Sequence, residues 1–339
     1  MCTDFLLQAA DGSLVNGRSM EFGKDLETQI LVGGKDTRLQ GHAPDSGPGL
    51  SWIAQYGYVG LAATIGEHPL ITDGMNTAGL SIGALWLPVS RYARTVNDAS
   101  QALRVDLFIN WVLGNFYAVG SVRQALQTVE VWGNDVLQAE MPVHFSIHDN
   151  TGDSIVVEFM NGGTQVYDNP VAVTTNAPPF PWHLANIGTY VGLTALDAAS
   201  IDIGGFSCDP PGHGSGMRGL PGDSTPPSRF IRTVFQKQFA TQPADNVEAC
   251  SLALHLLNTV DIPLGTSRPQ DTADGDDYTQ WAVVKSLSDL TLSYRTYDNP
   301  TVMTIDLTTL EGLSSPGETP YAMPSEPVFV DITGKLRAQ

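Results

Sequence analysis

Residues 1–22 of the chain read MCTDFLLQAADGSLVNGRSMEF. Two runs within them, 5–9 and 14–20, are short and mostly apolar or alternating, and the Asp11-Gly12 step between them is typical of a turn. The pattern predicts two β-strands. Cys2 precedes the first strand, and it becomes the first residue of the chain if an aminopeptidase removes Met1.

A cysteine at the amino terminus carries a thiol and a free α-amino group on one residue. An unperturbed α-amine has a pKa of about 7.7–8.0 and an unperturbed thiol about 8.5, so both groups titrate near neutral pH. The amine can then act as the base for its own side chain, as in enzymes with an N-terminal nucleophile. Taken alone, Cys2 is more simply explained by chance, so this hypothesis depends on the rest of the chain.

Strand signals dominate beyond this segment. Strands are predicted at 29–32, 58–65, 80–85, 144–148, 154–160, 164–167, 172–175, 281–286, 291–295 and 302–307. Apolar residues at helical spacing predict helices over 103–116, 122–129, 229–239 and 246–257, and the Pro- and Gly-rich segment 204–227 is predicted to be a long loop. Since strand runs are flanked by helical runs without βαβ alternation, we expect antiparallel sheets with helices packed outside them, an α+β layered fold.

The charge of the chain excludes several classes of protein. The 339 residues include 17 Lys+Arg and 36 Asp+Glu, a formal charge of −19. Nucleic-acid binding is excluded because phosphate contacts need clustered Lys and Arg, and docking on an anionic membrane is disfavoured for the same reason. No apolar run reaches the roughly 18 residues of a membrane span. With no recognisable leader, the protein is expected to be soluble and cytoplasmic, or periplasmic if a leader was removed and a start Met added.

The sequence contains patterns that could indicate a cofactor or metal site, but their surroundings or spacing do not suit such a site. Residues 214–219 match G-x-G-x-x-G, but they follow prolines rather than a strand and precede no helix. His144 and His148 share one face of a predicted strand about 13 Å apart, too far to bind one ion. No G-x-S-x-G nucleophile motif occurs in the chain. No metal and no cofactor are therefore predicted, and Cys208 and Cys250 are expected to be buried structural thiols.

Residues 1–22 and six further regions resemble the choloylglycine hydrolase family, which contains penicillin V acylases and bile salt hydrolases. That family opens with M-C-T and continues with G/A-R-x-M/L-D, here residues 1–3 and 17–21. The other matching segments are TDGMNTAGL (72–80), ALWLP (84–88), TTNAP (174–178) with WHL (182–184), GLPGD (219–223) with SRF (228–230), YTQW (278–281) and RTYDN (295–299). Trp86 and Trp182-His183 make the chain most similar to the Gram-negative penicillin V acylase branch, whose members also cleave acyl-homoserine lactones.

The resemblance implies a single domain, residues 2–339, with the four-layer αββα fold of N-terminal-nucleophile hydrolases, in which two antiparallel sheets lie between helix layers. It further implies that Met1 is removed and that Cys2 attacks the amide carbonyl of a small N-acyl substrate to form a thioester, while its α-amine takes and returns the proton. Acyl transfer through a thioester needs no cofactor. By analogy with the family, a homo-oligomer, usually a tetramer, is expected.

Three charged residues receive roles from the resemblance. Arg18 would lie beside the thiol and favour the thiolate, since a nearby cation favours the charged form. Glu21 stands where the family has Asp, whose carboxylate binds and orients the α-amine. The extra methylene moves this carboxylate by roughly one bond length, and errors near 1 Å can cost about a hundredfold in rate. Arg229 would anchor the surroundings of the thiol electrostatically.

The remaining roles concern the oxyanion and the acyl group. Asn176 would donate its side-chain amide to the oxyanion together with the backbone N–H of Trp86. Met20, Phe22 and Trp86 are the expected lining of an apolar substrate pocket. Asp73 and Asn76 are expected to shape a turn rather than to touch substrate.

The leading hypothesis is therefore a cysteine amidohydrolase for which penicillin V and acyl-homoserine lactones are preferred to conjugated bile acids. The bile-salt branch typically has Asn where Trp86 stands, and Trp should narrow a steroid-sized pocket. A conjugated bile salt hydrolase stays an alternative, as does a non-catalytic binding protein that keeps the fold, for which Glu21 is the supporting feature. An unrelated acidic β-rich binding module is rejected, because the matching segments lie in register along the chain.

Overall fold

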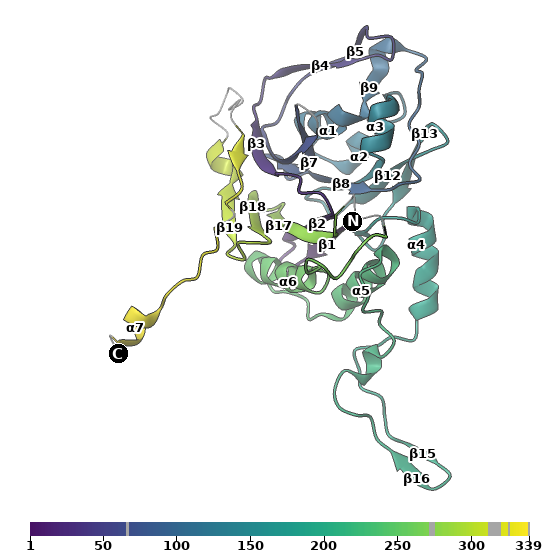
Figure 1. Cartoon of the computed structure of the whole chain (residues 1–339), viewed down its shortest axis with the longest axis vertical. Coiled ribbons are helices and arrows are strands. Elements are labelled where there is room, and N and C mark those ends of the chain that lie inside the picture. The colour runs from purple at the N-terminus through teal and green to yellow at the C-terminus, as the bar shows by residue number, and fades with distance from the viewer. Residues whose placement is uncertain (66–67, 271–274, 311–319, 325, 338–339) are drawn as a thin grey trace.

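A computed structural model describes residues 1–65, 68–270, 275–310, 320–324 and 326–337 of the chain (Figure 1). Its first sheet is antiparallel and has the strand order β14-β1-β2-β17-β18-β19. The strands are β14 (Val173–Thr174), β1 (Cys2–Gln8), β2 (Leu14–Phe22), β17 (Tyr278–Ser286), β18 (Thr291–Thr296) and β19 (Met303–Asp306). The two strands predicted within residues 1–22 therefore pair with each other, and Cys2 lies opposite Met20.

The second sheet is also antiparallel and has the strand order β13-β12-β11-β8-β7-β6-β3-β20. The strands are β13 (Gly163–Asp168), β12 (Ser154–Met160), β11 (Val143–His148), β8 (Ser81–Trp86), β7 (His68–Asn76), β6 (Tyr58–Ile65), β3 (Gln29–Gly33) and β20 (Tyr321–Ala322). Two-stranded sheets are formed by β4 (Arg38–His42) with β5 (Pro48–Ile53), β9 (Ala102–Arg104) with β10 (Glu130–Trp132), and β15 (Ile201–Ile203) with β16 (Phe206–Cys208).

Helices cover the outer face of each sheet (Figure 1). Those on the second sheet are α1 (Phe108–Asn115), α2 (Val119–Ala125) and α3 (Asp135–Glu140), and those on the first are α4 (Phe180–Ile187), α5 (Pro226–Phe239) and α6 (Asn246–Asn258). A short α7 (Thr333–Arg337) follows near the carboxyl end, and 3-10 turns lie at Ala99–Gln101, Val105–Leu107, Gly188–Tyr190, Ser215–Met217 and Leu307–Leu310. No helix among the described segments has the length and apolar character needed to cross a bilayer.

The alternation of side chains along β1 shows how the layers are built. Phe5 and Leu7 pack in the apolar layer beneath α5 and α6, whereas Cys2 and Leu6 belong to the layer between the two sheets. This follows from the period of two along a strand, which sends successive side chains to opposite faces. A third apolar layer lies between the second sheet and α1. Three apolar layers between four layers of structure give the α+β, αββα architecture, and Cys2 faces its centre.

Three sequence predictions were wrong in instructive ways. Residues 72–76 are part of β7 rather than a turn, and the turn is confined to Asn76–Leu80. The predicted helix 103–116 starts with strand β9, and only Phe108–Asn115 is α-helical. The loop predicted over 204–227 contains β16, the turn Ser215–Met217 and the first residues of α5. The G-x-G-x-x-G segment lies in and around that turn and adds no strand to either large sheet.

Candidate active site

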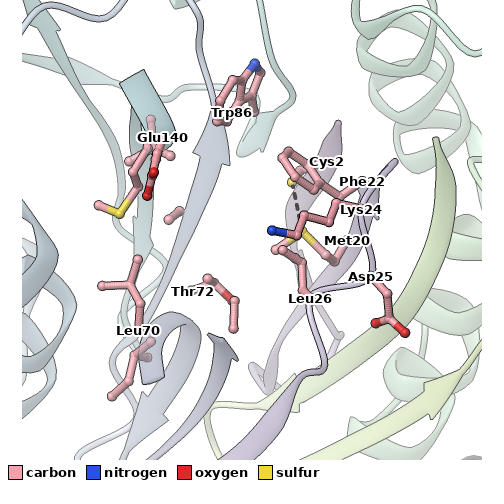
Figure 2. Close-up of a pocket in the computed structure, with 15 residues that line it drawn as sticks. Cys2, Met20, Phe22, Lys24, Asp25, Leu26, Leu70, Thr72, Trp86 and Glu140 are labelled. Atoms are coloured by element: carbon pink, nitrogen blue, oxygen red, sulfur yellow. Dashed lines mark hydrogen bonds between the residues drawn. The ribbon is translucent and has the colours of Figure 1, made fainter. Parts of the chain in front are cut away.

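Cys2 opens onto a cavity of about 510 Å³ that extends between the two sheets (Figure 2). Its walls come from β2 and the loop after it, from β6, β7 and β8, and from α3 and the segment that leads into β11. The lining residues besides Cys2 are Met20, Phe22, Lys24, Asp25, Leu26, Ala63, Leu70, Ile71, Thr72, Ala84, Trp86, Glu140, Met141 and Val143. All three residues expected to line an apolar pocket are among them. The rings of Phe22 and Trp86 meet edge to face, with centroids 5.6 Å apart.

Arg18 lies beside the thiol. Its Nη2 is 3.5 Å from the Sγ of Cys2 and also donates to the carbonyl of Ala84. Its Nη1 donates to the carbonyl of Thr72 at 3.1 Å and to Oδ2 of Asp73 at 3.2 Å. Burial works to lower the pKa of Arg18, but the charges of Cys2, Asp73 and Asp4 raise it above its ordinary value. The guanidinium is therefore a fixed positive charge at hydrogen-bonding distance from the sulfur.

Glu21 is fully buried next to the start of β1. Its Oε1 accepts from Oγ1 of Thr279 at 3.0 Å, and its Oε2 lies 4.0 Å from Nη1 of Arg229. Within the described residues, Oε2 has no hydrogen-bond partner. Burial raises the pKa of Glu21 above its ordinary value, against the lowering effects of Arg229 and of the N-terminal ammonium. The backbone of Glu21 pairs with Met1: the amine of Met1 donates to its carbonyl, and its own N–H donates to the carbonyl of Met1 at 2.8 Å.

Asn176 and Arg229 complete the shell around Cys2. The backbone N–H of Cys2 donates to Oδ1 of Asn176 at 2.6 Å, and Nη2 of Arg229 donates to the same oxygen at 2.8 Å. Arg229 also donates to the carbonyl of Cys2 and to Oγ1 of Thr3. Although Arg229 lies in the first turn of α5, its side chain is fully buried. Burial lowers its pKa, while the charge of Glu21 opposes that effect.

The backbone of Trp86 faces the same shell. Leu87 N–H donates to the carbonyl of Pro142 at 2.7 Å, so alternate residues of β8 bond toward β11 and Trp86 bonds toward the opposite side. On that side the carbonyl of Trp86 accepts from Nδ2 of Asn176 at 2.9 Å. The N–H of Trp86 points the same way as its carbonyl. An amide nitrogen carries two hydrogens, so Asn176 keeps a second one available for another acceptor.

One predicted position has a different role in the structure. Asn76 shapes the turn as expected, since its Oδ1 accepts from the N–H groups of Ala78 and Leu80 at 3.0 Å each. The prediction for Asp73 was wrong, because it is buried in β7 and bonds Arg18. Both of its oxygens also accept from Nζ of Lys285, at 2.7 and 2.8 Å. The sequence analysis missed Lys285, although a lysine that directly follows the apolar run 281–284 in a predicted strand is a recognisable sign of a buried ion pair.

The two histidines singled out in the sequence, His144 and His148, have different hydrogen-bond partners, and the other two cysteines are not paired with each other. His148 bonds Asp4 through Nε2, whereas His144 bonds Glu158 through Nδ1 at 3.0 Å and the carbonyl of Thr175 through Nε2 at 2.9 Å. Cys208 and Cys250 are both free and only half-buried, so the expectation that they are buried was wrong. Partial burial raises the pKa of the Cys250 thiol to about 11, which makes it a poor nucleophile at neutral pH.

Comparison with known proteins identifies the family. Residues 2–318 match the family model described as linear amide C–N hydrolases, choloylglycine hydrolase family. This chain belongs to the choloylglycine hydrolase family. It is 30% identical over 311 residues to the bile salt hydrolase/transferase of Clostridium perfringens, covering 91% of this chain and 92% of that protein. It is 26% identical to the penicillin V acylase of Pectobacterium atrosepticum, covering 86% and 77% of the two chains.

Solved structures of the choloylglycine hydrolase family share the fold. The C2A variant of the conjugated bile acid hydrolase from Clostridium perfringens superposes with a TM-score of 0.85 at 29% identity, over 98% of this chain and all of the other. Penicillin V acylase from Agrobacterium tumefaciens gives a TM-score of 0.74 at 25% identity, over 91% and 87% of the two chains. The N-terminal-nucleophile hydrolase fold expected from the sequence is thus confirmed, and the protein is a hydrolase of linear amides.

Proposed function

We propose that this hydrolase cleaves N-acyl amides through a thioester on Cys2 after removal of Met1. The observation that carries the proposal is the position of the Cys2 sulfur, which lies on the wall of a largely apolar cavity and 3.5 Å from a buried guanidinium. A thiolate there is stabilised by a charge-assisted contact, and the burial of both Cys2 and Arg18 strengthens that electrostatic effect. The apolar walls suit the acyl part of a substrate.

The proposed reaction follows from the groups around the sulfur. The α-amine of Cys2 takes the thiol proton, and the sulfur forms a bond to the amide carbon. The resulting oxyanion is bound by the N–H of Trp86 and by the free hydrogen of the Asn176 amide, and each such donor contributes about 3–4 kcal/mol to the transition state. The intermediate then breaks its C–N bond, and the α-ammonium gives its proton to the departing amine. Water, deprotonated by the same α-amine, hydrolyses the thioester and restores the thiol.

Removal of Met1 fits the hydrogen bonds at the start of β1. The nitrogen of Cys2 is 2.6 Å from Oδ1 of Asn176, a contact that a free amine at this place retains. Glu21 lies across the strand pair from Met1, and its Oε2 is buried without a hydrogen-bond partner among the described residues. A free ammonium at Cys2 carries hydrogens beyond the one that Asn176 accepts, and a buried carboxylate is a suitable partner for its charge. We therefore propose that Glu21 takes the role that Asp has in the family.

The cavity supports two classes of acyl group. Its volume of about 510 Å³ is within the ordinary range of small-molecule sites, about 300–1,000 Å³. Phe22 and Trp86 place two aromatic rings, in edge-to-face contact, on its wall, which suits a slender acyl chain or a single aromatic ring, as in acyl-homoserine lactones and penicillin V. Conjugated bile salts are the second candidate. They are favoured by the names of relatives such as the bile salt hydrolase/transferase of Clostridium perfringens.

A substrate panel tests the proposal. Primary-amine release is measured with penicillin V, penicillin G, short and long acyl-homoserine lactones, and glycocholate. Intact mass establishes beforehand that Met1 is gone. We expect turnover in the wild type and in Cys250→Ala, the matched thiol control, and none in Cys2→Ala. Turnover retained by Cys2→Ala would refute the mechanism. No turnover by the mature wild type on any substrate would favour a binding protein that keeps the fold.

We also propose that the chain, as a single domain over residues 2–339, assembles into a homo-oligomer, a tetramer by analogy with the family. The hairpin formed by β15 and β16 supports this, because it projects from the body as an arm (Figure 1). Ile203 and Phe206 on the arm are 63% and 70% exposed. Light scattering after size-exclusion chromatography should show the oligomer for the wild type and a smaller species for Ile203→Ser/Phe206→Ser. A wild-type monomer would contradict the proposal.

A further inference from the structure

Three buried charged side chains form a row that ends at the Cys2 sulfur. Lys285 on β17 donates to both oxygens of Asp73 on β7, at 2.7 and 2.8 Å. Asp73 in turn accepts from Nη1 of Arg18 on β2 at 3.2 Å, and Nη2 of Arg18 lies 3.5 Å from the sulfur. The side chains of Arg18, Asp73 and Lys285 expose no surface to solvent. The row therefore joins both sheets across their shared core.

Gly83 on β8 provides the space for this row. A Cβ at position 83 would lie 2.9 Å from Cδ of Arg18 and 2.9 Å from Oδ2 of Asp73, closer than carbon atoms and oxygen atoms pack. The backbone of β8 therefore approaches the ion pair directly. Solvent has no place beside it, so the charges interact without screening by bulk water.

The net charge of Arg18, Asp73 and Lys285 determines whether the row can balance a thiolate at Cys2. Two cations and one carboxylate leave a net charge of +1, which a thiolate at Cys2 brings to zero. Without Lys285, the carboxylate of Asp73 alone would already balance Arg18, and a thiolate would be a second anion on one guanidinium. Because an uncompensated charge is costly in a buried site, a charge at the Cys2 sulfur is balanced by the whole row and not by Arg18 alone.

The other charged groups facing Cys2 form their own pairs or meet water. Arg229 on α5 faces Glu21 on β2 at 4.0 Å. Asp4 on β1 accepts hydrogen bonds from Ser146 and Asn16 and is bonded to His148. The three charged residues on the cavity wall, Lys24, Asp25 and Glu140, are exposed to solvent, which screens them. Substitutions at Asp73 or Lys285 leave Arg229 paired with Glu21. Asp4 does sense Lys285: burial works to raise the pKa of Asp4, and the charges of His148 and Lys285 together bring it below its ordinary value.

We infer that Lys285 is a positioning residue that neutralises Asp73 and thereby leaves the charge of Arg18 available to stabilise the Cys2 thiolate. Asp73 holds the guanidinium in place, and Lys285 offsets the negative charge that this support introduces. The inference rests on the proposed role of Cys2 as the nucleophile. It assigns a function to two residues that do not touch the sulfur.

Two variants with opposite expected effects test the inference. Lys285→Met removes one cation and brings the row to zero, whereas Asp73→Asn removes the carboxylate and brings it to +2. The readout is the rate of Cys2 alkylation by iodoacetamide against pH, followed on the N-terminal peptide by mass spectrometry so that Cys208 and Cys250 do not contribute. The pH of half-maximal alkylation is expected to rise by about 1 unit in Lys285→Met and to fall in Asp73→Asn.

The double variant Asp73→Asn/Lys285→Met is the decisive control. Its row again carries +1, so we expect its alkylation profile to return to that of the wild type, although two buried side chains have changed. A purely structural role predicts instead that the double variant is at least as perturbed as either single one. Profiles that do not move, or that move in the same direction in both single variants, would overturn the inference. If Lys285→Met fails to fold, Asp73→Asn and the double variant still decide the outcome.

The experiment separates this inference from the proposed function. Alkylation needs no substrate, so it reports the thiolate whether or not a substrate has been found. Hydrolysis by the wild type with unchanged alkylation profiles in the variants would leave the proposed function standing and remove the role of Lys285. Hydrolysis that persists in Cys2→Ala would refute the proposed Cys2 mechanism, and Arg18, Asp73 and Lys285 would then have no role in catalysis through Cys2.

Discussion

Replacing Glu21 by Asp is the most informative single change at the proposed amine site, because it restores the residue that the family has there. The carboxylate of Glu21 is held in place by the Oγ1 of Thr279 at 3.0 Å, in a site with no exposed surface. Shortening the side chain by one methylene withdraws the carboxylate by roughly one C–C bond, about 1.5 Å. That distance breaks the contact with Thr279 and moves the proposed acceptor away from the Cys2 amine.

The expected losses can be worked out from these contacts. Misplacement of a catalytic group by about 1 Å costs about a hundredfold, so kcat of Glu21→Asp is expected to fall by about that factor. KM should change little, because Glu21 is not among the residues that line the cavity. Removing one buried methylene costs about 1 kcal/mol and the lost hydrogen bond about 1 kcal/mol more, so unfolding should become easier by about 2 kcal/mol.

Steady-state amine release and urea denaturation measure the two effects. Thr279→Val is the matched control, because it keeps Glu21 but removes the hydroxyl that positions it, and its kcat should fall in the same direction by a smaller factor. If Glu21→Asp equals or exceeds the wild type in kcat, the reasoning is refuted. Glu21 would then be a weakened substitute for Asp rather than a group matched to this site.

Three further predictions concern the oxyanion, the amine side of the substrate and the start of α5. Asn176→Ala should lower kcat by about 10²–10³-fold in steady-state assays, because it removes the proposed oxyanion donor. The amino group of Lys24 points into the cavity (Figure 2), so Lys24→Met should lower kcat/KM about threefold for substrates with an anionic amine part, such as penicillin V, and leave homoserine lactones unchanged. Hydrogen bonds from Ser228 and Thr225 lower the pKa of Asp223 to about 2. Since this pKa is below the unfolded value of about 4, its stabilisation is complete at neutral pH and is lost as the pH falls from about 4. Asp223→Asn should therefore ease urea unfolding at pH 7, by an amount that shrinks toward pH 3.

The local part of the fold could be predicted from the sequence because it depends on local patterns. The predicted strand 154–160 agrees with β12 residue for residue, and the predicted helix 246–257 differs from α6 by one residue. The prediction for residues 72–76 was wrong because Asp-Gly-Met-Asn has the composition of a turn. In the structure Gly74 serves close packing, since a Cβ there would lie 2.6 Å from the carbonyl oxygen of Val59 on β6 and 2.7 Å from Cδ1 of Leu113 on α1. That requirement comes from a neighbouring strand and from a helix, and the local pattern of residues 72–76 does not contain it.

The residues of the candidate site were likewise predicted only in part. The resemblance to the family supplied Cys2, Arg18, Asn176 and Arg229, and the structure brings these four together in one hydrogen-bonded group. The link from Arg18 to Lys285 was missed. Its members are separated by 55 and 212 residues and meet only because two sheets face each other. Their pairing depends on strand order and register, which follow from the whole fold.

The backbone pairing of Met1 with Glu21 has a practical consequence for producing the protein. Because Met1 continues β1 without disturbing the pairing of Cys2 with Met20, the chain folds with residues still attached to the nitrogen of Cys2. An affinity tag fused ahead of Met1 would thus keep the nitrogen of Cys2 in a peptide bond, and under the proposed mechanism such a chain would lack the amine that takes the thiol proton. We expect it to be inactive until a protease leaves Cys2 as the first residue. Purification handles for this protein belong at its other end.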